Sequence, residues 1–130
     1  MFKNVFENIF HKEEKALKNK THFIDIAKSP VTTKDNVVIQ VGGLLSYDVI
    51  DYKLYKTGGI CSNVELQHLA ITTFGNIISG YDANNVTMGL RDINAIAHAV
   101  IKNEVAKCGI RLVNVEINNI VIPEVAFKKV

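Results

Sequence analysis

Hydrophobic residues at the start of the chain recur at the spacing of one face of a helix. The stripe consists of Phe2, Val5, Phe6, Ile9 and Phe10. It ends near His11, and residues 12–20 are mostly polar, with four lysines and two glutamates. We therefore predict an amphipathic helix over residues 1–20 whose apolar face is confined to its first half.

After residue 20 the period of the pattern changes to two, which is typical of β-strands. Ser29-Pro30 favours extended backbone and indicates an edge strand. Turn residues at Thr33–Asn36, followed by alternation from Val37 to Val49, predict a hairpin with a long second strand. The Gly42-Gly43 pair inside that strand predicts a bulge or a sharp bend.

A helix is predicted to begin at Ser62, because Ser62 and Glu65 have the spacing of a capping box. Its inward positions are Leu66, Leu69, Ala70, Thr73, Phe74, Ile77 and Ile78. Gly75 lies about opposite Leu66 and is expected to face away from the core. Residues 51–59 form a short segment before this helix, to which the pattern assigns no element.

A second helix is predicted from about Val86, with Gly109 as the glycine that ends it. Its inward positions are Leu90, Ile93, Ala97, Val100, Ile101, Val105 and Cys108. An apolar strand follows from Arg111 to Ile122. The order of elements predicts an α+β fold in which the hairpin and the C-terminal strand share one sheet, and the two helices cover one face of it.

Composition agrees with one ordinary domain. The chain has 130 residues, of which 48% are hydrophobic and 22% charged. A net charge of +2 with only two arginines argues against a nucleic-acid partner. Two cysteines without a secretory leader favour reduced thiols in the cytosol over a disulfide-stapled secreted fold. No apolar run in the sequence is long enough to span a bilayer.

The sequence contains no pattern that predicts a catalytic, cofactor or metal site. The four histidines are widely separated, and none has the i, i+4 partner of a helical zinc site. Cys61 beside a helix start could have a lowered pKa, but an idle or buried thiol is the simpler interpretation. Cys108 is interpreted as a core residue. We therefore expect a protein that is not an enzyme.

Three stretches resemble the motifs of one known family. The stretch "VTTKDNVVIQVGGLLSYDVID" resembles a hairpin that begins T-K-D-[NG]-V and closes on aromatic-x-V-x-D. The stretch "LAITTFGNIISGYD" is similar to an L-A-x-T-x-L-R-x-x-I-G helix, and "LRDINAIAHAVIKNEVAKCGIRLVNVEINNIVIPEV" to an R-x-x-I-N helix followed by G-I-x-[LV]-x-x-V-x-I-x-x-I-x-[IL]-P. Across residues 31–125, the chain thus resembles the stomatin/prohibitin/flotillin/HflK-C (SPFH, or band 7) domain.

The chain thus divides into three predicted segments. The resemblance implies residues 21–125 as an SPFH (band 7)-like domain and 126–130 as the truncated start of a C-terminal helix. Residues 1–20, which the family does not explain, are interpreted from their hydrophobic stripe as an amphipathic helix and candidate membrane-surface anchor. The resemblance also implies a non-enzymatic, membrane-associated scaffold without cofactors, peripheral at the cytoplasmic face. Such a scaffold organises membrane domains or holds client proteins through homo-oligomers, which in the family depend on a coiled coil after the proline. Gly75 departs from the family, which usually has arginine there.

Alternatives remain open at this level. One is a soluble protein–protein interaction domain that binds one client without lipid contact, and another is an enzyme or small-ligand binder, for which no convergent polar groups can be named. The N-terminal stripe also has two interpretations. It can enter the headgroup boundary of an anionic bilayer, with Lys3 and Lys12 near the phosphates, or it can pack on the domain's own sheet or on a partner chain.

Overall fold

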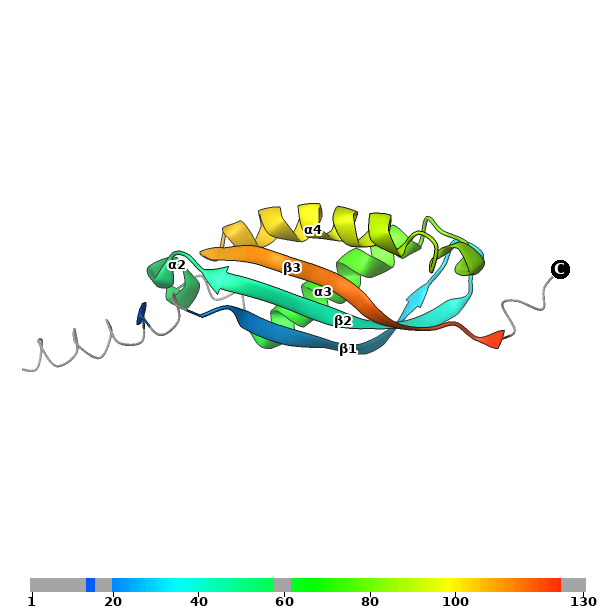
Figure 1. Ribbon diagram of the computed structural model, residues 1–130, viewed down its shortest axis with the longest axis horizontal. Helices are drawn as coiled ribbons and strands as arrows, with labels where there is room; N and C mark the ends of the chain where they lie inside the picture. The colour runs from blue at the N-terminus through cyan, green and yellow to red at the C-terminus, as the bar shows by residue number, and fades with distance from the viewer. Residues whose placement is uncertain (1–13, 16–19, 58–61, 125–130) are drawn as a thin grey trace, which may run out of the picture.

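The computed structural model describes residues 14–15, 20–57 and 62–124, and Figure 1 shows one twisted sheet with two helices on one face. The three antiparallel strands stand in the order β1-β2-β3. The elements are β1 (His22–Thr32), β2 (Val38–Val49), α2 (Tyr52–Thr57), α3 (Asn63–Ile78), the 3-10 helix η1 (Ala83–Asn85), α4 (Leu90–Ala106) and β3 (Ile110–Val121). The predicted α+β class is confirmed, with the hairpin and the C-terminal strand in one sheet.

Two glycines explain how β2 can serve as the central strand. The pairing of β2 with β3 shifts register between Gly42 and Gly43, which confirms the predicted bulge. A Cβ on residue 43 would collide with the carbonyl oxygen of Glu116, so glycine lets the two backbones approach. A second shift, between Ile26 and Ser29, bends the edge strand β1 near its proline.

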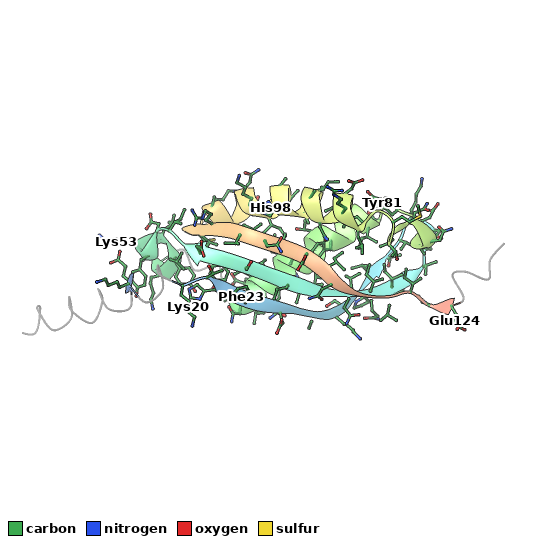
Figure 2. All side chains as sticks on the ribbon, in the orientation of Figure 1. Lys20, Phe23, Lys53, Tyr81, His98 and Glu124 are labelled. Carbon is green, nitrogen blue, oxygen red and sulfur yellow. The ribbon has the colours of Figure 1, made fainter. Side chains whose placement is uncertain are left out.

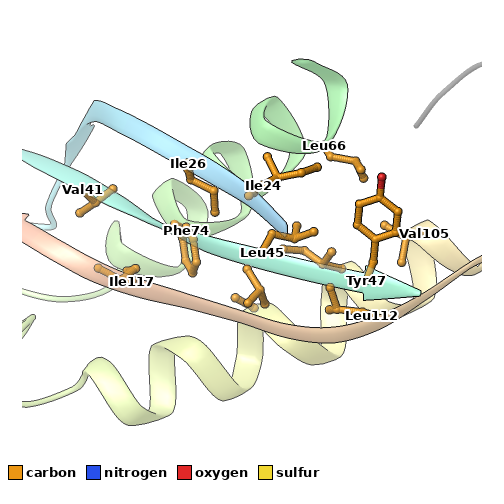
Figure 3. Packing of buried hydrophobic residues seen from close by; sticks show 14 of the residues in the cluster. Ile24, Ile26, Val41, Leu45, Tyr47, Leu66, Phe74, Val105, Leu112 and Ile117 are labelled. Atoms are coloured by element: carbon orange, nitrogen blue, oxygen red, sulfur yellow. The ribbon is translucent and has the colours of Figure 1, made fainter. Parts of the chain in front are cut away.

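The core lies between the helices and one face of the sheet, as Figure 3 shows. Its strands contribute Ile24, Ile26, Val41, Leu45, Leu112 and Ile117, and its helices contribute Leu66, Phe74, Ile93, Ile101 and Val105. Alternate strand residues such as Phe23 point to the opposite, uncovered face and are exposed. One sheet face is therefore buried and the other meets solvent.

The start of α3 and the end of α4 agree with the predictions. The Ser62 side chain accepts a hydrogen bond from the Glu65 amide at 3.3 Å, so the N-cap half of the predicted capping box is present. Gly109 has a φ of 73°, the left-handed conformation expected of a glycine after a helix.

One helix is not predicted and three expectations about the others are wrong. Residues 52–57, to which the pattern assigns no element, form α2. The second helix begins at Leu90, because residues 83–85 form η1 and Gly89 precedes the first turn of α4. Val100 is 45% exposed instead of facing inward. Gly75 lies against the sheet: α3 packs over β1, and a Cβ there would be 3.5 Å from Val31 Cγ1.

Candidate functional site

Two surfaces and one hollow are the features of the described part of the chain that could bind a partner. Within it, no group of three or more His, Cys, Asp or Glu side chains is placed to hold a metal ion. Among the described helices, none has both the length and the apolar character needed to cross a membrane. The candidate functional regions are therefore the two ends of the sheet and one hollow beside α3.

The strands run along the long axis of the domain, so each end collects residues that are distant in sequence (Figure 2). One end, here called the α2 end, holds α2 together with the start of β1, the end of β2 and the start of β3. The other, the hairpin end, holds the turn Thr33–Asn36, η1 and the end of β3. Lys20 and Lys53 lie at the α2 end in Figure 2, and Glu124 lies at the hairpin end.

Aromatic side chains fix α2 to the sheet at the α2 end. The His22 ring stacks on Tyr47 with centroids 5.1 Å apart, and the hydroxyl oxygens of Tyr47 and Tyr55 are 3.4 Å apart. Burial, together with the hydrogen bond to Tyr55, raises the pKa of Tyr47 far above its ordinary value of 10.0. The Tyr47 phenol therefore stays neutral and acts as a structural link between β1, β2 and α2.

Asp48 is neutralised by its neighbours at the same end. Arg111 Nη2 donates to Asp48 Oδ2 at 2.7 Å, and Thr21 Oγ1 donates to Asp48 Oδ1 at 2.7 Å. The hydrogen bond from Arg111, followed by that from Thr21, lowers the pKa of Asp48 below its ordinary 3.8. This pair contributes little net charge to the surface.

The remaining side chains of the α2 end combine apolar and basic character. Ile50 is 54% exposed and Leu54 38% exposed. Lys53 and Lys56 are exposed on α2, and Lys20 is exposed just before β1. We call Ile50, Lys53, Leu54 and Lys56 the α2 surface. Sequence reasoning missed it, because six helical residues are too few to show a period.

At the hairpin end, the polar side chains of the turn form hydrogen bonds within the domain. Asp35 Oδ1 accepts hydrogen bonds from the Thr33 hydroxyl and, at 3.1 Å, from the Ala83 amide, which joins the hairpin to η1. The Lys34 amide donates to the Tyr81 carbonyl at 2.8 Å. The T-K-D-N residues therefore hold the hairpin against the connection between α3 and α4.

The hairpin end also has the opposite charge. Its described charged residues are Lys34 and Arg91 against Asp35, Asp82, Asp92 and Glu124. The α2 end carries Lys20, Lys53 and Lys56 against Asp51, beside the paired Asp48–Arg111 and Glu104–Lys107, and Glu65 lies near this end in the first turn of α3. The domain is thus basic at one end and acidic at the other.

A hollow of about 720 Å³ lies beside the N-terminal half of α3. It is lined by residues of β1, α3 and the end of α4, including Ala27, Val64, Leu69, Ile71 and Val105. Its size is within the range of small-molecule sites. Its polar lining residues, such as Gln67 and Thr72, are half-buried or exposed, which fits an apolar contact better than an active site.

Cys108 requires a correction. It is buried, as a core residue should be, but it is disulfide-bonded. The expectation of a reduced thiol is therefore wrong for Cys108. The chain has one other cysteine, Cys61, which lies outside the described residues.

The predicted contact residues are not among those that the structure describes. Phe2, Val5, Phe6, Ile9 and Phe10 all fall within residues 1–13, outside the described ranges. Residues 126–130, predicted as the start of a further helix, also lie outside them. Both expectations stay predictions.

Comparison with known proteins identifies relatives of the whole domain. The family described as "SPFH domain / Band 7 family" matches residues 11–130. The chain is also 29% identical over 100 residues to an uncharacterized protein of Archaeoglobus fulgidus. That alignment includes 77% of this chain but only 40% of the relative.

Proposed function

The chain belongs to the SPFH (band 7) family, and we propose that it is a non-enzymatic, membrane-associated scaffold module of the stomatin/prohibitin/flotillin type. The observation that carries the proposal is the difference in charge between the two ends of the domain. The described chain enters β1 at the basic α2 end and leaves β3 at the acidic hairpin end (Figure 1). A strand of 12 residues spans about 40 Å, so the domain can hold its two ends well apart.

In this proposal residues 1–20 contact the bilayer and residues 21–125 form the spacer. Residues 126–130 start the segment through which the full-length protein assembles into homo-oligomers that organise membrane domains or hold clients. Location at the cytoplasmic face stays a prediction.

The N-terminal stripe supplies most of the membrane affinity. Burial of each large apolar side chain stabilises by about 1.5–3 kcal/mol, so Phe2, Phe6 and Phe10 can together contribute several kcal/mol. Residues 1–20 contain five lysines and three glutamates, a net charge of +2. This charge gives weak attraction to an anionic leaflet that salt will screen.

Co-sedimentation with vesicles of phosphatidylcholine and phosphatidylserine tests the proposal. We expect the chain to sediment with these vesicles, less so as salt is raised, and the double variant Phe6→Ser/Phe10→Ser to remain in solution at an unchanged melting temperature. A sharp fall in melting temperature, with no vesicle binding by the wild type, would place the stripe in the core and exclude the anchor.

The hollow beside α3 favours a second candidate function, a soluble domain that binds one client protein without lipid contact. Val64 is a suitable position to test it, because its side chain is exposed and lines the hollow. On this alternative the wild type does not bind vesicles of any composition. Val64→Asp then abolishes recovery of a client with the tagged chain, whereas on the scaffold proposal Val64→Asp leaves vesicle binding intact.

A further inference from the structure

We propose that the α2 surface is a second membrane contact, through which the folded domain itself binds the anionic headgroups of a bilayer. The inference rests on the proposed function, because it specifies which end of the domain faces the lipid. It assigns a role to side chains that the family motifs do not specify. Ile50 stands at an unspecified position of the hairpin motif, and Lys53, Leu54 and Lys56 lie beyond it.

The first argument is the exposure of two aliphatic side chains beside a buried one. Tyr52 is only 2% exposed and holds α2 to the domain, while Ile50 and Leu54 on either side of it point into solvent. Single exposed apolar residues are common on protein surfaces and carry no function by themselves. Their neighbours decide what they can bind.

Those neighbours are basic. Lys53 and Lys56 stand on α2, and the His22–Tyr47–Tyr55 contacts bring the start of β1, and with it Lys20, to the same end. Asp51 opposes them, and its Oδ1 accepts a hydrogen bond from the Leu54 amide at 3.1 Å. Aliphatic side chains flanked by lysines suit the boundary between acyl chains and anionic headgroups.

The tyrosines and the absence of spare arginine favour lipid over other polyanions. Tyr55 is half-buried, and tyrosine is enriched at the level of lipid headgroups because one part of its ring is apolar and the other polar. Arg111, the arginine of this end, is held by Asp48, whereas nucleic-acid surfaces usually present free arginines to phosphates and bases.

The surface is already ordered in the folded domain. The amides of Ile50 and Asp51 both donate to the Gly109 carbonyl, at 2.9 and 3.1 Å, so the turn before α2 is fixed to the turn before β3. The Tyr47–Tyr55 contact fixes the helix itself. Binding through this surface therefore requires little ordering, which lowers the entropic cost of contact.

A tryptophan reporter tests the contact directly, because the chain contains no tryptophan. In the full chain, Leu54→Trp places one indole on the α2 surface and Met88→Trp places one at the hairpin end, where Met88 is 87% exposed. With phosphatidylserine-containing vesicles we expect the emission of Leu54→Trp to shift to shorter wavelength and to be quenched by brominated lipid. The emission of Met88→Trp should stay unchanged. Ile50→Trp provides a second reporter if Leu54→Trp does not fold.

Charge variants provide the second arm. A lysine near an anionic membrane contributes about fivefold to partitioning, so Lys53→Gln/Lys56→Gln should lower the partition coefficient by roughly 25-fold. The matched control Lys34→Gln removes a lysine from the hairpin end and should change partitioning less than twofold. The melting temperature of Lys34→Gln should equal that of the wild type. That of Lys53→Gln/Lys56→Gln should fall by a few degrees at most, because both lysines are exposed but the Lys56 Nζ lies 5.8 Å from the centroid of the Tyr52 ring.

The outcomes separate this inference from the function on which it rests. If the wild type does not bind vesicles, the membrane proposal fails as a whole. If the wild type binds but Leu54→Trp and Ile50→Trp are not quenched and Lys53→Gln/Lys56→Gln binds normally, only the α2 contact is overturned. An equal emission shift with soluble inorganic phosphate would also overturn it, since the surface would then recognise an anion and not a bilayer.

Discussion

The two ends of the domain use similar residue types for different purposes. At the hairpin end, Thr33 and Asp35 turn inward and hydrogen-bond to the turn and to the Ala83 amide. At the α2 end, Asp48 likewise accepts a hydrogen bond from Arg111 within the domain. Ile50 and Leu54, however, remain exposed among lysines. The difference indicates that residues specified by the motifs serve the architecture of this fold, while side chains that the motifs do not specify form the proposed contact surface.

The largest effect should come from breaking the turn that holds the α2 end together. Gly109 has a positive φ, and a Cβ there would collide with the Asp51 carbonyl oxygen. We expect Gly109→Ala to reduce the free energy of unfolding by about 2–5 kcal/mol, through backbone strain and overpacking. Urea unfolding measures the loss.

Gly80→Ala is the matched control for this substitution. A Cβ at Gly80 would stand 3.5 Å from the Ile77 carbonyl oxygen, an ordinary contact, and the residue is exposed. Its effect should stay below about 1 kcal/mol. Equal stability of Gly109→Ala and the wild type would show that the α2 end is held differently.

At the hairpin end, Asp35→Ala removes the acceptor shared by the Thr33 hydroxyl and the Ala83 amide. We expect a loss of about 1–2 kcal/mol in the free energy of unfolding. Vesicle binding should not change, because this end is proposed to face away from the bilayer.

Asp82→Ala provides the comparison, since Asp82 precedes η1 without a side-chain capping bond. Its effect should remain within about 0.5 kcal/mol. If Asp35→Ala were equally mild, the hydrogen bonds of the T-K-D-N turn would not explain how the hairpin end is held.

The smallest effect concerns the ion pair of the α2 end and depends on pH. The pKa of Asp48 is lowered in the folded state by Arg111 and then Thr21, so its contribution is complete above the ordinary value of 3.8 and is lost as pH falls below it. Asp48→Asn should therefore cost about 0.2–1 kcal/mol at pH 7, as is usual for a solvent-accessible pair. The difference from the wild type should shrink when unfolding is measured below pH 3.8, and a difference independent of pH would contradict the assignment.

The sequence predicts those parts of the fold that local chemistry determines. Ser62 with Glu65, Gly42-Gly43 and Gly109 each carry a conformational preference that survives in the structure. The helix faces were predictable where the stripe is wide. Val100 lies at the edge of the apolar face of α4, and its side chain is exposed. Periodicity alone cannot predict how far the neighbouring elements cover that edge.

Other features form only through distant contacts. The six residues of α2 are far too short for an independently stable helix, and the burial of Tyr52 and the contact of Tyr55 with Tyr47 hold it. The disulfide of Cys108 requires a partner that no local pattern specifies. The α2 surface could not be predicted from the sequence either, because its position depends on α2, which no local pattern predicts.

The central claim is that the domain stands upright on the bilayer, as contact through the α2 end requires, and neutron reflectometry on a supported bilayer containing phosphatidylserine measures this most directly. Which end faces the lipid is read from the emission of Leu54→Trp against that of Met88→Trp. An upright domain with strands of 12 residues predicts a protein layer extending about 40 Å or more from the headgroups. A domain lying on its sheet would form a layer of only about 20–25 Å, the thickness of one helix layer on one sheet. A layer of that thickness, or no layer at all, would contradict the account.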